Sequence, residues 1–433
     1  MLTYDLLHKT RNKEPLTTEE IRFLVEGFTK GDIPDYMMSA WMMAVCCQGL
    51  TDRETVDLTL AMRDSGDCLD LSPIGAVTVD KHSTGGIGDK TTLLLAPIVA
   101  ACGGHVPKMS GRGLGFTGGT IDKLESIPGF RTNLTLPEFY ENTSKIGCCI
   151  IAQSGDLTPA DKKMYALRNL TATVESIPLI CASIMSKKLA LGADCILLDV
   201  KYGSGAFMKT QREAAALARC MVRVGKQAGR SCRAVITDMN APLGYAVGNA
   251  LEVAEVIQIL RGDFDNRLAD LAVTLSANMM QLSGMGTLVK CWSKAEKALR
   301  SGAALEKLRE MIAAQGGDAK VCDDLSRLPQ ARESRVITAK ATGYITRIQS
   351  EEIGLACLTL GAGRTADSPA IDPGAGVVFR AAVGDPISRG DEICTVYGAK
   401  PAQLDEACER IEAALSIEDI PAPKIPLVSK LVR

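Results

Sequence analysis

Two glycine-rich stretches hold most of the residues whose types and spacing could do chemistry. They read DKHSTGGIGDKTT at 80–92 and SGRGLGFTGGTIDKLE at 110–125. Glycines allow successive backbone N–H groups to turn toward one point, where they attract anions. The candidate donors among them are the ammonium of Lys81 and the hydroxyls of Ser83, Thr92, Ser110 and Thr120. The two stretches therefore predict an anion-binding site.

Neither stretch fits a common nucleotide-binding motif. A literal GxGxxG is formed by Gly113, Gly115 and Gly118. The possible helix that follows is cut short by Pro128, which argues against a dinucleotide-binding unit. The first stretch has Asp89 before Lys90 in place of the glycine that a phosphate-loop NTPase requires. Single glycines are often plain turn residues, but two such loops at the ends of parallel strands would face the same ligand.

Length and composition favour a multidomain protein that binds a small molecule. The chain has 433 residues, 46% of them hydrophobic and 23% charged, with a net charge of -2. This length predicts two or three domains, and the weak net charge argues against a nucleic-acid partner. We expect no membrane span, because no stretch reaches the roughly 20 apolar residues that one needs. The fifteen cysteines lack metal-ligand spacing and suggest buried thiols in the cytoplasm.

The hydrophobic pattern predicts an α/β fold with a separate all-α lobe. A mainly parallel mixed sheet flanked by helices is expected, plus a C-terminal α+β subdomain. Residues 1–65 and 160–192 are helical in pattern and form the all-α lobe. Residues 75–159 and 193–330 form the α/β lobe, which carries both glycine-rich stretches, and 336–433 form the C-terminal subdomain. A substrate would lie between the two lobes.

The N-terminal helices carry local signals of their own. Thr17 with Glu20, and Thr51 with Glu54, each match the capping box that begins a helix. Residues 34–47, PDYMMSAWMMAVCC, are apolar almost all round. Such a helix is buried, and any exposed remainder would suit a homodimer interface; simple core packing explains the pattern equally well.

Both glycine loops closely resemble the signature loops of the class II nucleoside phosphorylases, the thymidine and pyrimidine-nucleoside phosphorylases. The resemblance continues through residues 161–190, 199–210 and 237–255, so it spans most of the chain. It implies a pentosyltransferase that cleaves a pyrimidine nucleoside with inorganic phosphate, without an organic cofactor. It also implies that the phosphate is held by Lys81, Ser83, Thr92, Ser110 and Thr120. The resemblance assigns dimerisation and base recognition to the all-α lobe and phosphate binding to the α/β lobe.

The residues can be related to that reaction chemically. Phosphate is already an anionic nucleophile, so the site needs donors to hold it rather than a general base. Negative charge grows on the departing pyrimidine, which calls for donors aimed at the base. Ser183 and Lys187 are four apart on one face of an expected helix, and Arg168 lies on the preceding one. They resemble the family's base clamp, with Tyr165 and Phe207 as walls.

His82 is one of three histidines in the chain. A single histidine is often structural, but this one follows Lys81 in the first glycine loop and matches the family's histidine that faces the base. We expect it to donate a hydrogen bond or a proton to O2 of the pyrimidine. His82, Arg168 and Lys187 are thus the expected catalytic residues, and Asp161 is expected to orient a neighbouring donor.

Two positions near the expected sugar end set this chain apart. Position 116 is Phe where members usually have His in GLGHTGGT, which raises the hypothesis that 2'-modified uridines with a bulkier sugar are accepted. Lys108 follows the broad-specificity pyrimidine-nucleoside phosphorylases and could donate to a ribose 2'-hydroxyl. This predicts cleavage of uridine as well as thymidine and deoxyuridine. A solvated lysine at a strand end is the competing interpretation.

The resemblance further implies a potassium site. Its matching residues are Gly88, Leu243, Ala246 and Glu255. Lys90 stands where the family often has threonine or another small residue, and its ammonium could fill the site and pair with Glu255. Potassium and Lys90 both stay open as occupants at this stage.

Three alternatives accompany the leading interpretation of a homodimeric pyrimidine-nucleoside phosphorylase. A strictly thymidine-selective phosphorylase would cleave deoxynucleosides and leave uridine untouched. An anthranilate-phosphoribosyltransferase-like enzyme would need an acidic site for a metal diphosphate in place of Arg168, Ser183 and Lys187. A silent nucleoside-binding paralogue would not need phosphate and base donors together.

Overall fold

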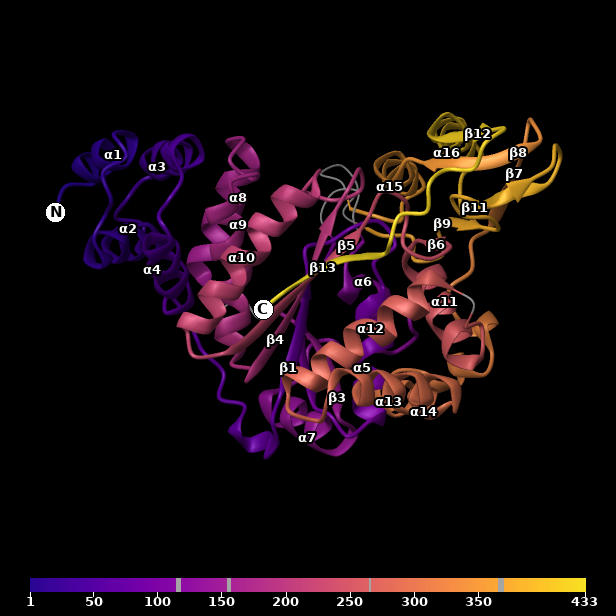
Figure 1. Cartoon of the computed structure of the whole chain (residues 1–433), viewed down its shortest axis with the longest axis horizontal. Coiled ribbons are helices and arrows are strands. Elements are labelled where there is room, and N and C mark those ends of the chain that lie inside the picture. Colours follow the sequence, from indigo (N-terminus) through magenta and orange to yellow (C-terminus); the bar gives the residue numbers. More distant parts are fainter. Residues whose placement is uncertain (114–117, 154–156, 265, 365–369) are drawn as a thin grey trace.

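The computed structural model describes residues 1–113, 118–153, 157–264, 266–364 and 370–433. Figure 1 shows helices gathered at one end, a sheet flanked by helices in the middle, and a mixed subdomain at the other end. Within the described ranges, helices long and apolar enough to cross a membrane are lacking.

A helical lobe forms one end of the molecule. It consists of α1 (Thr3–Arg11), α2 (Thr18–Lys30), α3 (Asp35–Gln48), α4 (Asp52–Arg63), α8 (Pro159–Leu170) and α9 (Ile177–Leu191). Both predicted capping boxes are present, at Thr17 and at Thr51, and fix the starts of α2 and α4. Trp41 of α3 is fully buried at the centre of this lobe. Helix α9 packs against α4, and α8 packs against α2.

The central sheet joins strands that are far apart in the chain. Its order is β1 (Val79–Ser83), β4 (Cys195–Tyr202), β5 (Ser231–Asp238) and β13 (Val428–Val432). The first three strands are parallel and β13 is antiparallel. A parallel pair, β2 (Val106–Ser110) and β3 (Cys148–Ala152), adjoins β1 through the bridge Thr78–His105. Register places Ser83, the last residue of β1, beside Asp199.

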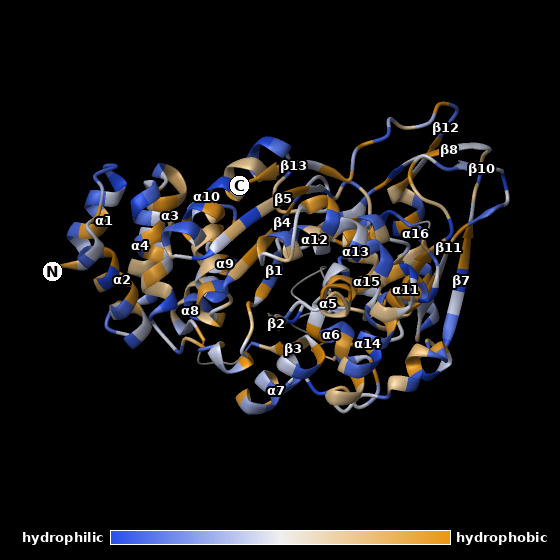
Figure 2. Ribbon diagram, turned by 60° about the horizontal axis from the view of Figure 1, so that its bottom comes forward, coloured by the Kyte–Doolittle hydropathy of each residue, from blue (hydrophilic) through white to orange (hydrophobic). Residues whose placement is uncertain are grey.

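Helices cover both faces of this sheet. They are α5 (Thr91–Ala101), α6 (Thr120–Glu125), α7 (Leu136–Ile146), α10 (Gln211–Gln227), α11 (Asn249–Arg261), α12 (Arg267–Leu282), α13 (Leu288–Arg300) and α14 (Ala303–Ala314). Every residue of β4 is buried, as expected for a parallel strand with helices on both sides. In Figure 2 the hydrophobic colour runs along helices around the sheet, whereas the outer turns of α1 and α2 are largely hydrophilic.

The C-terminal subdomain holds two small antiparallel sheets. One has the order β6 (Ala246–Val247), β9 (Gly376–Phe379), β11 (Glu392–Gly398) and β7 (Glu333–Thr338). The other contains β10 (Pro386–Ile387), β8 (Gly343–Ile348) and β12 (Leu415–Glu418), with α15 (Ser350–Thr359) and α16 (Pro401–Ala414) packed together. Short 3₁₀ turns are η1 (Ser72–Ile74), η2 (Ala319–Cys322) and η3 (Leu325–Arg327). The subdomain is tied to the α/β lobe twice, because it shares β6 with that lobe and the chain after it forms β13.

Candidate active site

A cleft of about 770 Å³ lies between the helical lobe and the two glycine loops. The loops contribute hydroxyls and backbone N–H groups to one wall, and α8 and α9 form the other. Predicted site residues on this cleft are His82, Ser83, Thr92, Lys108, Ser110, Thr120, Tyr165, Arg168, Ser183, Lys187 and Phe207. The expected phosphate and base residues therefore share one cavity, with the exception of Lys81. Phe116 lies outside the described residues.

The first glycine loop connects the end of β1 to the start of α5. Gly85 and Gly88 adopt positive φ angles of 89° and 73°, which turn the chain sharply. The hydroxyl of Ser83 accepts the N–H of Gly85 at 3.2 Å. Thr92 lies in the first turn of α5, where free N–H groups favour an anion. The loop thus presents hydroxyls and a helix N-terminus to the cleft.

The second glycine loop is closed by the carboxylate of Asp122, in α6. One oxygen of Asp122 accepts the N–H of Gly113 at 2.6 Å. The other lies 2.7 Å from the guanidinium of Arg364, which comes from the C-terminal subdomain. A Cβ on Gly119 would stand only 2.1 Å from the nitrogen of Gly113, so the two ends of the loop meet where only glycine fits. The C-terminal subdomain, for which the sequence suggested no chemistry, thus contacts this loop directly.

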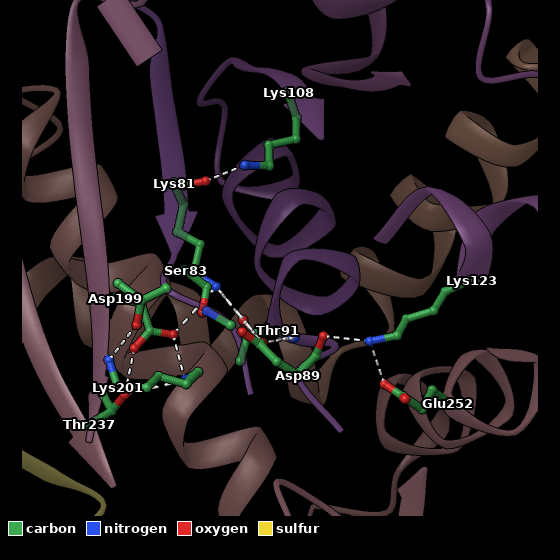
Figure 3. A network of polar contacts seen from close by, with 12 residues as sticks. Lys81, Ser83, Asp89, Thr91, Lys108, Lys123, Asp199, Lys201, Thr237 and Glu252 are labelled. Carbon is green, nitrogen blue, oxygen red and sulfur yellow. Dashed lines mark hydrogen bonds and ion pairs between the residues drawn. The ribbon is translucent and has the colours of Figure 1, made fainter. Parts of the chain in front are cut away.

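Lys81 lies behind the first loop rather than on the cleft wall. Its ammonium donates to the Thr91 hydroxyl at 2.5 Å and lies 3.4 Å from Asp199, as Figure 3 shows. Asp199 also holds Lys201 at 2.8 Å. Burial alone would raise the pKa of Asp89, but the charges of Lys81 and Lys201 hold it well below its usual range. In this structure Lys81 therefore supports the loop from within a buried ionic network.

The opposite wall is organised by Lys187 and Arg168. The Lys187 ammonium pairs with Asp161 and donates to the Ser183 hydroxyl at 3.0 Å. Arg168 donates to two backbone carbonyls of the α8–α9 connection, those of Thr173 at 3.1 Å and Val174 at 2.6 Å, and to the Leu179 carbonyl in the first turn of α9 at 3.2 Å. The Tyr165 ring lies 5.7 Å from the Arg168 guanidinium and 5.9 Å from the Lys187 ammonium. Lys187 and Ser183 are thus arranged as a pair, whereas Arg168 fixes the turn beside them.

His82 is half-buried among cations. Burial lowers its pKa well below 6.5, and four lysines lower it further: Lys188, Lys108, Lys187 and Lys81. The imidazole is therefore neutral near pH 7 and can donate a hydrogen bond from one ring nitrogen. A role as imidazolium proton donor does not suit these surroundings.

Asp80, the second residue of β1, connects two lysines that reach the cleft. Its carboxylate lies 2.7 Å from the ammonium of Lys188 and 3.3 Å from that of Lys108. Lys108 also donates to the carbonyl of Lys81. Burial lowers the pKa of Lys108 to about 7, against the opposing effect of Asp80. Sequence reasoning did not single out Asp80 or Lys188; the charged pair Lys187–Lys188 in an apolar helix was the available signal.

The expected cation site is filled by a side chain. The Lys90 ammonium is fully buried and donates to the Leu243 carbonyl at 3.1 Å, the Ala246 carbonyl at 2.6 Å and the Glu255 carboxylate at 2.6 Å. A Cβ on Gly88 would lie 2.7 Å from the Leu243 oxygen, so the first loop is tightly packed here. Burial would raise the pKa of Glu255, yet Lys90 lowers it. These oxygens already surround an ammonium, so the site does not fit an additional potassium ion.

Comparison with known proteins places this geometry in a family. Residues 4–66 match the glycosyl transferase family, helical bundle domain, and residues 75–305 match the glycosyl transferase family, a/b domain. Residues 344–418 match the pyrimidine nucleoside phosphorylase C-terminal domain. The fold and the paired loops thus define a pentosyltransferase of the glycosyl transferase type.

Similar full-length proteins narrow the assignment. The chain is 49% identical over 429 residues to the pyrimidine-nucleoside phosphorylase of Geobacillus stearothermophilus, covering 99% of both chains. It is 50% identical over 427 residues to that of Bacillus subtilis (strain 168), covering 98% of both. The chain belongs to the pyrimidine-nucleoside phosphorylase family. This confirms the family resemblance of the glycine loops.

A more distant solved structure shows the same fold. Anthranilate phosphoribosyltransferase from Thermus thermophilus superposes with a TM-score of 0.56 at 19% identity. It covers 71% of this chain and 98% of its own length. The predicted α/β fold with a separate helical lobe is confirmed.

Proposed function

We propose that this enzyme cleaves pyrimidine nucleosides with inorganic phosphate, giving the free base and ribose or deoxyribose 1-phosphate. One observation carries the proposal: hydroxyls of both glycine loops and the Ser183–Lys187 pair line opposite walls of one cleft. A nucleoside between them would expose its anomeric carbon to phosphate while its base meets cationic donors. Membership in the family supports the same reaction.

The chemistry follows from the charges that develop. An oxygen of hydrogen phosphate forms a bond to C1' of the sugar while the bond from C1' to N1 of the base breaks. The electron pair of that bond moves into the pyrimidine, where Lys187 and the N–H of His82 stabilise it. Asp161 keeps the Lys187 ammonium in place. Overall, hydrogen phosphate loses one proton and the departing base gains one, so the reaction balances.

Release of uracil or thymine tests the proposal through the change in absorbance of the base. Wild-type protein should release base only when phosphate is present. Lys187→Met should lower kcat at least about a hundredfold, the scale of losing one donor to developing charge. Nucleoside binding without release would favour the silent nucleoside-binding paralogue. Transfer of a phosphoribosyl group to anthranilate would favour the anthranilate-phosphoribosyltransferase-like alternative.

The proposed substrates are uridine, thymidine and deoxyuridine. Lys108 supports acceptance of ribose, because it lines the cleft and lies on β2, whose last residue, Ser110, begins the second glycine loop. Contacts of Lys108 with Asp80 and Lys81 show that it is a buried residue rather than a solvated surface lysine. A substrate panel decides the range. Cleavage of deoxynucleosides with uridine left untouched would establish the thymidine-selective alternative.

Lys90 is proposed to replace the monovalent cation. Its ammonium contacts the carbonyls of Leu243 and Ala246 and the Glu255 carboxylate, the oxygens expected to bind potassium. Activity should therefore persist after exhaustive exchange of potassium for tetramethylammonium. Loss of activity on removing potassium, with recovery when it is restored, would refute the replacement.

A homodimer through the N-terminal helices is the proposed assembly, in a cytoplasmic setting. Helices α1 and α3 expose apolar side chains, with Tyr4 65% exposed, Tyr36 72% and Met43 41%. All fifteen cysteines are free thiols, which suits a reducing compartment. Light scattering on the purified protein should give twice the chain mass. Tyr36→Glu combined with Met43→Glu should give the monomer mass, and a wild-type monomer would refute the assembly.

A further inference from the structure

Lys123 connects the two glycine loops from behind the cleft. It lies in α6, directly after the second loop, and is 1% exposed. Its ammonium donates to the backbone carbonyl of Asp89, in the first loop, at 2.7 Å. It also pairs with the carboxylate of Glu252, in α11, at 2.7 Å. Figure 3 shows the Lys123 ammonium between Asp89 and Glu252, with a dashed line to each.

We propose that Lys123 is a positioning residue that sets the spacing of the two phosphate-binding loops. The inference rests on the proposed phosphorolysis, in which both loops hold one phosphate. A buried ammonium is costly unless it is paired and hydrogen-bonded, so its position is strongly constrained by its two partners. Lys123 therefore acts on phosphate through the loops and does not itself touch the ligand.

On the side of the first loop, Lys123 contacts Asp89, the residue whose carboxylate organises that loop. The Asp89 carboxylate accepts the N–H of Thr91 at 3.2 Å and its hydroxyl at 2.7 Å. That hydroxyl oxygen accepts a hydrogen bond from the ammonium of Lys81. Holding the Asp89 carbonyl thus holds the turn from which Ser83 and Thr92 face the cleft.

On the other side, α11 acts as a common anchor. Glu252 accepts the N–H of Gly248 at 3.2 Å in addition to pairing with Lys123. One turn later on the same helix, Glu255 holds Lys90 of the first loop at 2.6 Å. Two carboxylates of α11 therefore each pair with one lysine: Glu252 with Lys123 of the second loop segment and Glu255 with Lys90 of the first.

This arrangement predicts an effect on phosphate and not on the nucleoside. Phosphate must meet Ser83 and Thr92 from one loop and Ser110 and Thr120 from the other at once. A shift of about 1 Å between such groups can cost about a hundredfold in rate. The base clamp is built on α8 and α9, whereas the two partners of Lys123, Asp89 and Glu252, lie on other parts of the chain.

The test compares Lys123→Met with the double variant Lys123→Met/Glu252→Gln. The single variant leaves the Glu252 carboxylate buried without its cation and should lower Tm. The double variant removes that charge, keeps an acceptor for Gly248 and should recover most of the Tm. If Lys123 positions the loops, the KM for phosphate stays at least tenfold raised in both variants, while the KM for nucleoside changes less than about twofold.

Lys145→Met serves as the matched control. Lys145 pairs with Glu141 on the surface of α7, where such a pair contributes little. Its Tm and both KM values should stay at the wild-type level. Three results would overturn the proposal. The KM for phosphate could return to the wild-type value together with Tm in the double variant, or it could never rise. The KM values for phosphate and for nucleoside could also rise equally.

Phosphate binding by calorimetry separates this inference from the proposed reaction. Wild-type protein that binds phosphate without releasing base would refute the reaction alone. The Lys123 variants would still be expected to bind phosphate at least tenfold more weakly than wild type. Unchanged phosphate affinity in them would refute the positioning role.

Discussion

Replacing Lys90 by threonine should make the stability and the activity of the protein respond to potassium. The substitution removes the ammonium that lies 2.6 Å from Glu255 and 2.6 Å from the Ala246 carbonyl. It leaves a small side chain next to these oxygens. Carbonyl and carboxylate oxygens are hard ligands that suit a monovalent metal cation.

The expected loss of stability can be worked out from the contacts. Removing one partner of a buried ion pair costs about 3 to 5 kcal/mol. The Glu255 carboxylate keeps the N–H groups of Tyr245 at 2.7 Å and Ala246 at 2.9 Å, and the Asn266 amide at 3.1 Å, which favours the lower end of that range. If the 433 residues unfold together, 1 kcal/mol corresponds to about 1 °C in Tm. Lys90→Thr should therefore melt about 3 °C below wild type without potassium.

Potassium should restore this loss in the variant. An ion at a hundred times its Kd stabilises the folded protein by about 2.7 kcal/mol, or about 3 °C here. The assay is thermal unfolding in potassium, sodium or tetramethylammonium chloride at equal ionic strength, followed by phosphorolysis rates in the same buffers. Lys90→Met is the matched control: it also removes the charge but occupies the space, so it should be destabilised and unresponsive.

Two results would refute this reasoning. The first is a wild-type protein whose Tm rises in potassium over sodium as much as that of Lys90→Thr. The second is a Lys90→Thr variant that gains nothing from potassium. Either result would mean that the Lys90 ammonium does not take the place of a potassium ion.

Three further predictions concern the cleft and its supports. Arg168→Lys cannot reproduce the three hydrogen bonds to the α8–α9 connection and the first turn of α9, so Tm should fall and kcat should drop at least about tenfold, measured by melting and kinetics. His82 stays neutral in the folded protein, whereas unfolded histidine binds a proton below about pH 6.5. Its contribution to stability is therefore present above that pH and is lost as pH falls, by up to about 1.4 kcal/mol per pH unit; urea unfolding of His82→Asn should lack this component. Arg364→Ala removes a partly exposed ion-pair partner of Asp122, and such a pair contributes about 1 kcal/mol. The KM for phosphate should therefore rise about fivefold, with no change in the KM for nucleoside.

Features that depend on neighbouring residues were predictable from the sequence. The capping boxes at Thr17 and Thr51 are four-residue patterns, and both are present. The pairing of Ser183 with Lys187 follows from helical spacing in the same way. Arg168 shows the limit of spacing: it was expected to point at the base, yet three of its bonds go to backbone carbonyls at and just after the turn that follows its own helix.

Long-range pairings were not predictable in this way. Lys188 pairs with Asp80 across 108 positions, and the β13 residues VSKLV give no sign of which sheet they join. A lysine in an apolar stretch signals a buried partner, because an unpaired buried ammonium is too costly to keep. It does not say which carboxylate that partner is. Lys123 is a similar case: it lies inside the glycine-loop motif, yet its partner Glu252 is on the distant helix α11.

Most lysines in and behind the cleft form ion pairs with carboxylates. The pairs are Lys81 and Lys201 with Asp199, Lys108 and Lys188 with Asp80, Lys123 with Glu252, Lys90 with Glu255, and Lys187 with Asp161. Their charges therefore fix the loops and the clamp before any ligand arrives, and they cost no reorganisation during the reaction. Phosphate is then expected to meet mainly hydroxyls and N–H groups, which form weaker bonds than free cations do. Such a site would hold phosphate in place for attack and still release the sugar phosphate that forms in the same position.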